Sequence, residues 1–192
     1  MSSVPKTLLS PEQYLHRERK AEFKSEFYRG EVFAMAGASI EHNRIVANLV
    51  REVGNALKDG ECEIFPSDLR VRVDPSGLYT YPDAVVVCGD AEFADESNDT
   101  VTNPAVLFEV LSESTEAYDR GPKASMYRDI SSLRELVLVA QDRISVECYV
   151  RQDDGRWMFG ETTKIDAEVS LASLNIRVAA AEIYRGVDWE TT

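Results

Sequence analysis

The segment AVLFEVL, residues 105–111, is the strongest indication of the fold in this sequence. Its nearly unbroken apolar character indicates a strand that is buried on both faces of a sheet. The exception is Glu109, which shares one face of the strand with Leu107 and Leu111 because side chains alternate along a strand. A carboxylate in such a place is costly unless it is paired or bound to a cation. The stretch therefore predicts part of the core and, at Glu109, a candidate site.

A second carboxylate stands at the start of the preceding apolar run. Asp83 follows Pro82 and opens the segment AVVVC, residues 84–88. Asp83 begins its strand and Glu109 lies near the end of its own, so the two carboxylates converge at a sheet edge if the strands are adjacent. Oxygen ligands of this kind suit Mg²⁺ or Mn²⁺. The alternatives are that Asp83 caps local backbone N–H groups and that Glu109 pairs with an arginine.

A lysine follows in the segment after residues 105–111. Asp119, Lys123 and Tyr127 are spaced four residues apart, which places them roughly on one face of a helix predicted over residues 116–129. The four-carbon stem of Lys123 could bring its ammonium group back towards Glu109. There it could stabilise negative charge at a phosphate or orient a metal-bound water. The alternative is an ordinary solvated lysine on the helix surface.

The remaining elements are predicted from caps, turns and hydrophobic period. Apolar residues three or four apart predict a long amphipathic helix over Ile40–Leu57 that packs on a sheet. The order of elements predicts an α/β (α+β) fold, with a central mixed sheet flanked by helices, as one domain over residues 1–192. The other predicted elements are a helix from Ser10 to about Phe23, strands within 26–35, a half-exposed strand over 69–73, a strand over 79–88, a meander over 136–162 and a small helix over 179–184.

Composition restricts the class of protein. The chain has 192 residues, 44% of them hydrophobic, which is enough for one globular domain with a substantial core. It has no apolar run of the ~20 residues that a membrane span needs, and its first residues do not resemble a signal peptide. The three cysteines, Cys62, Cys88 and Cys148, are odd in number and far apart. They predict reduced core residues and a cytoplasmic protein without a membrane partner.

The net charge of −13 argues against a simple nucleic-acid-binding module, whose affinity comes largely from neutralising phosphates. It does not argue against an enzyme that acts on nucleic acid through a metal-filled site. The acidic segment 90–99 is expected to be a solvated insertion.

The ordered set of Pro82-Asp83, residues 109–115 (EVLSEST), Asp119, Lys123 and Tyr127 resembles a large family of uncharacterised bacterial proteins. That family is described as restriction-endonuclease-like, with a domain of the PD-(D/E)XK nuclease superfamily. Residues 26–32 resemble its early hairpin, and His42 resembles its histidine at the start of the long helix. The resemblance runs from about Leu8 to Tyr184.

The resemblance implies a restriction-endonuclease-like core in which Asp83, Glu109 and the backbone carbonyl of Val110 are metal ligands. The superfamily motif has a lysine two residues after the glutamate, where this chain has Leu111. The chain resembles members whose lysine has moved to the following helix, which makes Lys123 the third catalytic candidate.

Five further residues are candidates for a supporting role, each with an ordinary alternative. One of the two hairpin acids, Glu26 or Glu31, could join the metal site, or both could be surface charges. His42 faces the core side of its helix and could simply be a semi-buried histidine. The tyrosine is more often a core residue than a catalytic one. The five are Glu26, Glu31, His42, Asp119 and Tyr127.

The sequence thus predicts a Mg²⁺-dependent endonuclease, with Mn²⁺ as a second suitable ion, that hydrolyses phosphodiester bonds, in DNA rather than RNA. A homodimer would fit an enzyme that cuts both strands across a two-fold axis. The alternatives are a non-enzymatic interaction module on a nuclease-like scaffold and a nuclease that acts on RNA or nucleotides.

Overall fold

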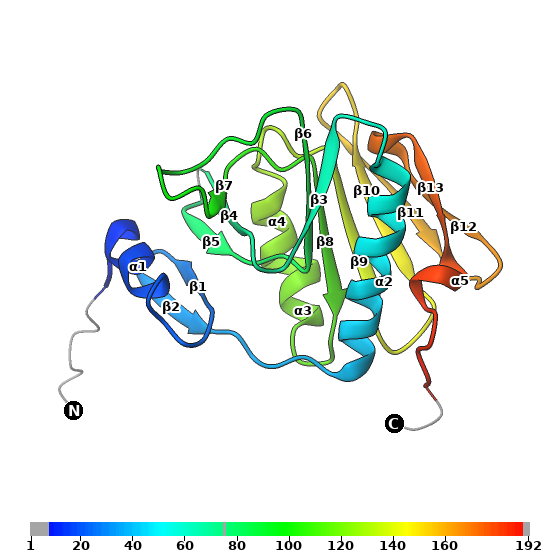
Figure 1. The fold of residues 1–192 in the computed structure, drawn as a ribbon, viewed down its shortest axis with the longest axis horizontal. Coiled ribbons are helices and arrows are strands. Elements are labelled where there is room, and N and C mark those ends of the chain that lie inside the picture. Colours follow the sequence, from blue (N-terminus) through cyan, green and yellow to red (C-terminus); the bar gives the residue numbers. More distant parts are fainter. Residues whose placement is uncertain (1–7, 75, 190–192) are drawn as a thin grey trace.

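The computed structural model describes residues 8–74 and 76–189. Within them the chain forms two main sheets and a small separate hairpin, with helices packed around them (Figure 1). The long helix α2, Ile40–Leu57, has the bounds that its apolar period predicts. No helix in these residues is both long and apolar enough to cross a membrane. The other helical segments are α1 (Pro11–Glu18), α3 (Glu116–Tyr118), the π-helical turn η1 (Asp119–Lys123), α4 (Ala124–Tyr127), the 3-10 turn η2 (Ala172–Leu174) and α5 (Ala180–Ile183).

The larger sheet has six strands in the order β11-β10-β9-β8-β6-β3. β8 and β9 run parallel and the other neighbours run antiparallel, so the sheet is mixed. Its strand β8 is the apolar stretch around Glu109, and all of its residues are buried. The predicted fold class, a mixed sheet flanked by helices, is confirmed. The strands are β3 (Cys62–Pro66), β6 (Ala84–Cys88), β8 (Val106–Leu111), β9 (Glu135–Ala140), β10 (Val146–Arg151) and β11 (Trp157–Thr162), and the small hairpin pairs β12 (Glu168–Leu171) with β13 (Ile176–Ala179).

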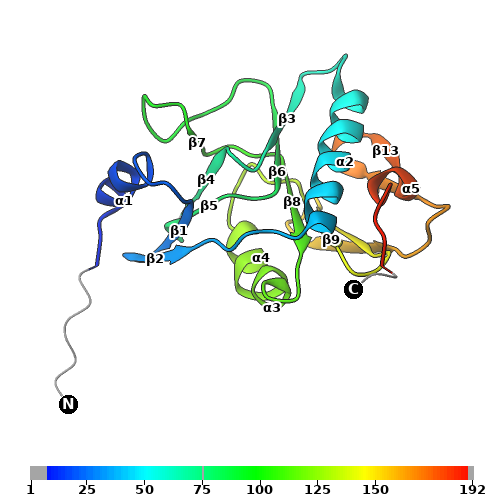
Figure 2. The ribbon, with the colours of Figure 1, turned by 60° about the horizontal axis from the view of Figure 1, so that its bottom comes forward.

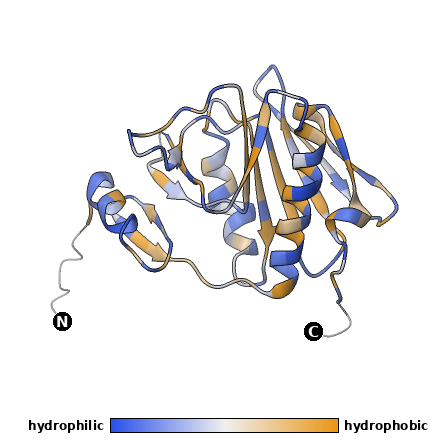
Figure 3. Ribbon diagram, in the orientation of Figure 1, coloured by the Kyte–Doolittle hydropathy of each residue, from blue (hydrophilic) through white to orange (hydrophobic). Residues whose placement is uncertain are grey.

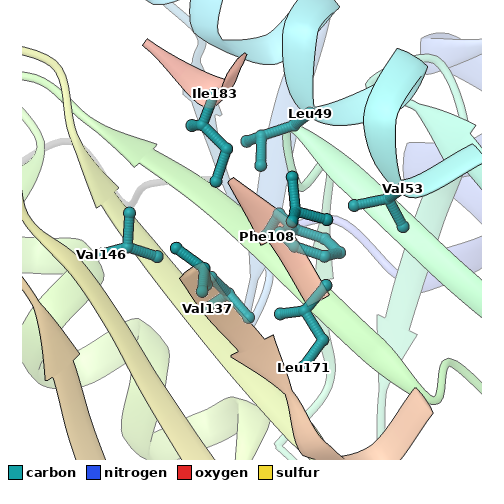
Figure 4. A pocket seen from close by; sticks show the side chains of 9 residues that line it. Leu49, Val53, Phe108, Val137, Val146, Leu171 and Ile183 are labelled. Atoms are coloured by element: carbon teal, nitrogen blue, oxygen red, sulfur yellow. The ribbon is translucent and has the colours of Figure 1, made fainter. Parts of the chain in front are cut away.

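Helix α2 covers one face of this sheet, beside the small hairpin and α5 (Figure 1). Figure 4 shows Leu49 and Val53 of α2 close to Phe108 of β8 and Val137 of β9. These side chains are fully or almost fully buried and leave no space for a water molecule between them. Burying each such side chain contributes roughly 1.5–3 kcal/mol. The apolar colouring of the central strands in Figure 3 follows this core.

The other face of the sheet is covered by the segment that carries Lys123. Ala124 and Tyr127 pack against Leu107 and Leu136 there. The helix predicted over residues 116–129 is confirmed from Glu116 to Tyr127, but its middle turn η1, between α3 and α4, is π-helical. Proline has no N–H for the helix ladder, so a Gly-Pro pair within η1 favours such a local widening.

The smaller sheet has five strands in the order β2-β1-β5-β4-β7. The single strand predicted over residues 79–88 is wrong, because its first part belongs to this sheet as β5 and its last part to the larger sheet as β6. Pro82 lies between them, and proline disfavours a continuous strand inside a sheet. The strands of the smaller sheet are β1 (Ser25–Tyr28), β2 (Glu31–Ala34), β4 (Arg70–Val73), β5 (Leu78–Thr80) and β7 (Thr100–Val101).

Strand β4 is more buried than its alternating sequence predicts. Arg70 is 4% exposed, although the strand over residues 69–73 was expected to be half-exposed. Its guanidinium group donates hydrogen bonds to Tyr81 Oη over 2.9 Å and to Thr100 Oγ1 over 2.7 Å, and it pairs with Asp99. The charge is buried at low cost because these partners satisfy its donors.

The first helix and the acidic segment also differ from the prediction. Helix α1 begins with the predicted cap at Ser10 but ends at Glu18, well before residue 23. Just after it, Arg19 pairs with Asp95 over 2.8 Å and with Asp99 over 2.7 Å. The acidic segment is therefore held against the end of α1 and is not merely a solvated insertion.

The prediction of three reduced cysteines is wrong for two of them. Cys62 and Cys88 form a disulfide, whereas Cys148 is free and buried. The two cysteines are 26 residues apart in the sequence, so no local pattern indicates that they pair. Strands β3 and β6 pair antiparallel with Cys62 directly opposite Cys88, so the register brings the two sulfur atoms together. Cysteine usage therefore gives no support to the cytoplasmic location expected above.

Candidate active site

The candidate site lies in a cleft of about 1570 Å³. Hairpin β1–β2, the segment 35–39 and the start of α2 line one part of it, and the end of β8 with α3 and η1 lines another. Figure 2 shows how the segment after β2 runs across to α2 and so joins the hairpin to the main body. Asp83, Glu109 and Lys123 all line this cleft.

Asp83 is held beside β8 by strand register. β6 and β8 pair antiparallel with Ala84 opposite Phe108, so Asp83 comes opposite Glu109 one step further along. Residues directly opposite in such a pair project to the same side. The Asp83 carboxylate also accepts a hydrogen bond from the Val110 N–H over 2.7 Å. The expected adjacency of the two carboxylate-bearing strands is confirmed.

Glu109 is buried and hydrogen-bonded within the core of the site. The residue is 4% exposed. The Tyr127 hydroxyl donates to Glu109 Oε1 over 2.5 Å, and Lys123 Nζ lies 2.9 Å from the same oxygen. The partner of the buried carboxylate is therefore a lysine and a tyrosine, and not an arginine.

Lys123 stands between three carboxylates from three different elements. Its ammonium lies 2.9 Å from Glu109 of β8, 3.1 Å from Glu26 of β1 and 3.4 Å from Asp119 of η1. We call these four residues the lysine cluster. Lys123 is only 5% exposed, so it is not a solvated surface lysine. The π-helical turn η1 contains both Asp119 and Lys123, and such turns occur frequently at functional sites.

Burial and the neighbouring charges shift the pKa values of both Glu109 and Lys123. Burial raises the pKa of Glu109 to about 8, an effect that the Lys123 ammonium only partly offsets. Burial also lowers the pKa of Lys123, but Glu109, Tyr127, Glu26 and Asp119 outweigh it and raise that pKa well above its usual value. At neutral pH and without a metal ion, the lysine therefore stays charged while Glu109 tends to hold a proton. Perturbed groups of this kind are typical of functional sites.

His42, from the first turn of α2, approaches the other carboxylate. Its Nε2 lies 3.3 Å from Asp83 Oδ2, and the ring is half-buried. Burial lowers the pKa of the imidazole, but Asp83 and the backbone of Val110 outweigh it, so the pKa lies above its usual value. Nδ1 of His42 is buried and has no hydrogen-bond partner among the described residues. His42 is therefore in contact with a site carboxylate and is not only a core residue of the helix.

The two hairpin acids have different places. Glu26 lines the cleft, joins the lysine cluster and accepts a hydrogen bond from the Thr80 hydroxyl of the neighbouring strand β5. Glu31 begins β2 opposite Tyr28 and is not one of the described residues that line the cleft. Of the two supporting acids considered from the sequence, the structure thus brings Glu26 into the cluster.

The donors in the cleft fit a small divalent cation. Glu26, Glu109 and Asp119 surround the Lys123 ammonium, and the Asp83 carboxylate lies beside His42 in the same cleft. An added cation would offset the negative charge of these carboxylates. In residues 8–74 and 76–189, no group of three or more His, Cys, Asp or Glu side chains is arranged to hold a metal ion by itself. Mg²⁺ needs only one or two carboxylates because it keeps several waters, whereas a structural zinc site needs four protein ligands.

Sequence reasoning missed two residues that line this cleft, Phe33 and Tyr118, and a buried residue behind it, Thr80. Thr80 supports Glu26 from another strand, and no local pattern indicates that contact. Tyr118 places its ring 6.0 Å from Lys123 Nζ, and Phe33 lies opposite Glu26 in the hairpin. The alternation of Glu31 and Phe33 with Val32 along β2 was the available signal for Phe33, since alternate residues share a face.

Comparisons with known proteins agree with this architecture. Residues 11–180 match the family Uma2, described as "Putative restriction endonuclease". Two proteins of Synechocystis sp. are similar over most of their length: "Uncharacterized protein sll1609" is 38% identical over 88% of this chain and 96% of its own, and "Uncharacterized protein slr1290" is 36% identical over 96% of both. The fold matches the crystal structure of "a putative nuclease belonging to DUF820" from Anabaena variabilis, with a TM-score of 0.74 and 17% identity over 92% of this chain and 97% of that one.

Proposed function

Because the chain belongs to the Uma2 family and has a nuclease-like fold, we propose that it is a metal-dependent endonuclease that hydrolyses phosphodiester bonds in DNA. The observation that carries the proposal is the meeting of Asp83, Glu109 and Lys123 in one cleft. They come from three separate segments, and Glu109 and Lys123 are buried ionisable groups, which an ordinary apolar core does not contain. The fold alone would not establish an activity.

Asp83, Glu109 and the backbone carbonyl of Val110 would hold the ion, for which Mg²⁺ is the first candidate and Mn²⁺ the second. A bound Mg²⁺ would lower the pKa of a coordinated water and place a positive charge beside the phosphate. The contacts from His42 and the Val110 N–H hold the Asp83 carboxylate in place, while Tyr127 orients Glu109. Such support of ligating carboxylates is a usual requirement of metal sites.

Lys123 would act at the reacting atoms. Its ammonium is kept charged by the surrounding carboxylates and lies beside Glu109. From there it can donate a hydrogen bond to the attacking water or to a non-bridging phosphate oxygen, where negative charge develops. A fixed donor in a site with little water is worth more than the same donor in bulk solvent. Asp119 and Glu26 hold the ammonium in position.

A cleavage panel tests the proposal. Labelled duplex DNA, single-stranded DNA and RNA would be incubated with Mg²⁺ or Mn²⁺ and wild-type protein, Asp83→Ala, Glu109→Gln or Lys123→Met. We expect the wild type to cleave DNA and each variant to lose cleavage while it retains the wild-type circular dichroism spectrum. Asp153→Asn, at an exposed turn far along the chain, is the matched control and should cleave normally. Equal activity of Asp83→Ala and the wild type would refute the mechanism.

The second candidate function is a non-enzymatic interaction module. It is favoured by the net charge of −13 and by the contacts with Lys123 and Tyr127 that already satisfy the Glu109 carboxyl group. Calorimetric titration with Mn²⁺ separates the two candidates. The endonuclease requires ion binding that Asp83→Asn and Glu109→Gln weaken, whereas the module requires none. Light scattering after size-exclusion chromatography would test the homodimer that a two-strand cutter would form.

A further inference from the structure

Two aromatic side chains stand exposed beside the lysine cluster. Phe33 of β2 pairs with Glu26 of β1, so both project from the same face of the hairpin into the cleft. Tyr118 of α3 places its ring 6.0 Å from Lys123 Nζ and also lines the cleft. Phe33 is 48% exposed and Tyr118 is 37% exposed. Two rings with accessible faces thus lie next to the carboxylates that we assign to the ion.

Packing of the fold does not account for these exposed rings. On the opposite face of the same hairpin, Phe27 is 2% exposed and stacks on Tyr14 with ring centroids 4.9 Å apart. Phe33 belongs to none of the buried clusters of the core. Figure 3 shows that apolar colouring continues over β2 at the edge of its sheet. In this hairpin Phe27 therefore packs in the core, whereas Phe33 lies exposed in the cleft.

The charges of the cleft disfavour a rigid double helix. Its basic lining residues are Lys24, His42 and Lys123, against twice as many acids. Lys24 pairs with Asp68, and Lys123 is engaged by three carboxylates. Duplex DNA is held mainly by lysine and arginine side chains that neutralise the phosphates of both strands. The described residues of this cleft offer little of that kind of contact.

We propose that the cleft binds a single, unpaired nucleic-acid strand, with bases stacked on Phe33 and Tyr118 and the backbone directed at Asp83 and Glu109. This rests on the proposed nuclease function and names its substrate. Stacking on aromatic rings adds to the affinity that a protein has for the backbone of a single strand, and it tolerates any base because every base has a π face. In a duplex those faces are covered by neighbouring base pairs, so the two rings would have nothing to stack on.

The test is equilibrium binding, measured by fluorescence anisotropy with labelled oligonucleotides of about 16 nucleotides, near the upper site size of known single-strand binders. Ca²⁺ replaces Mg²⁺, and single-stranded DNA, RNA of the same sequence and the DNA duplex are compared. We expect either single strand to bind at least tenfold more tightly than the duplex, and the two single-strand arms show whether the sugar matters. Phe33→Ala and Tyr118→Ala should each weaken single-strand binding roughly fivefold or more, the lower range for one base–aromatic stack.

Matched variants isolate the role of the rings. Val32→Ala changes the neighbouring residue, which is 46% exposed on the other face of the hairpin, and Phe159→Ala removes a ring that is 54% exposed on β11. Both should bind like the wild type. Phe33→Leu keeps an apolar side chain and should still weaken binding, whereas Phe33→Trp should restore it, so loss of the hairpin fold is not mistaken for loss of stacking.

The outcomes separate this inference from the proposed function. Equal or tighter binding of the duplex, or Phe33 and Tyr118 variants that behave like Val32→Ala, would overturn the inference even if DNA cleavage depended on Asp83. Conversely, ring-dependent binding of single strands without any Asp83-dependent cleavage would leave the inference standing and overturn the nuclease.

Discussion

The protonation of Glu109 should make the stability of the metal-free protein depend strongly on pH. Its carboxyl has an ordinary pKa of 4.5, and burial raises it to about 8 in the folded chain. The folded state therefore binds this proton more tightly than the unfolded state does. The contribution to stability is complete below about pH 4.5 and is lost progressively as the pH rises towards 8.

Glu109→Gln removes this dependence because glutamine is a neutral isostere that still offers an oxygen to Lys123 and Tyr127. One pKa unit corresponds to about 1.4 kcal/mol, so the free energy of unfolding of the wild type should fall by about 4 kcal/mol relative to the variant by pH 8. The Lys123 ammonium stays charged throughout this range because its pKa is raised well above the ordinary value. The two proteins should be nearly equally stable at about pH 5.

Urea denaturation followed by tryptophan fluorescence, in the presence of a chelator, measures the difference directly. Glu96→Gln, which removes an exposed acid from the segment between β6 and β7, is the control and should keep the pH dependence of the wild type. If the free energy of unfolding of the wild type and Glu109→Gln ran parallel between about pH 5 and 8, the raised pKa of Glu109 would be refuted.

Three further predictions concern the site and the strands that hold it. Lys123→Met should lower the free energy of unfolding by about 3–5 kcal/mol, because it leaves buried carboxylates unpaired, and the loss in urea denaturation should be larger at pH 8 than at pH 5. Tyr127→Phe removes the hydrogen bond to Glu109 and should cost about 1–3 kcal/mol in the same assay; an unchanged midpoint would contradict that contact. Reducing the disulfide between Cys62 and Cys88, which closes a 26-residue separation, should cost about 3 kcal/mol, as measured by thermal unfolding with and without dithiothreitol. The double variant with serine at both positions should be insensitive to the reductant.

The elements that could be predicted from the sequence are those whose burial produces a regular spacing of apolar residues along the chain. The apolar spacing of Ile45, Leu49 and Val53 defined α2, and the unbroken apolar run around Glu109 defined the buried strand β8. The same run marked Glu109 as a costly exception, and the resemblance of the ordered segments to the family indicated Asp83 and Lys123 as its partners. These inferences succeeded because burial of one face imposes a local pattern on the chain.

Contacts between segments that are distant in the sequence became apparent from the folded chain alone. The register of β3 on β6 placed Cys62 opposite Cys88, although nothing near either cysteine indicates the other. Docking of the hairpin β1–β2 on β5 brought Glu26 to Lys123 and turned Phe33 towards the cleft. A local pattern records that a residue is buried or exposed, but its partner is fixed by strand register and packing between segments far apart in the chain.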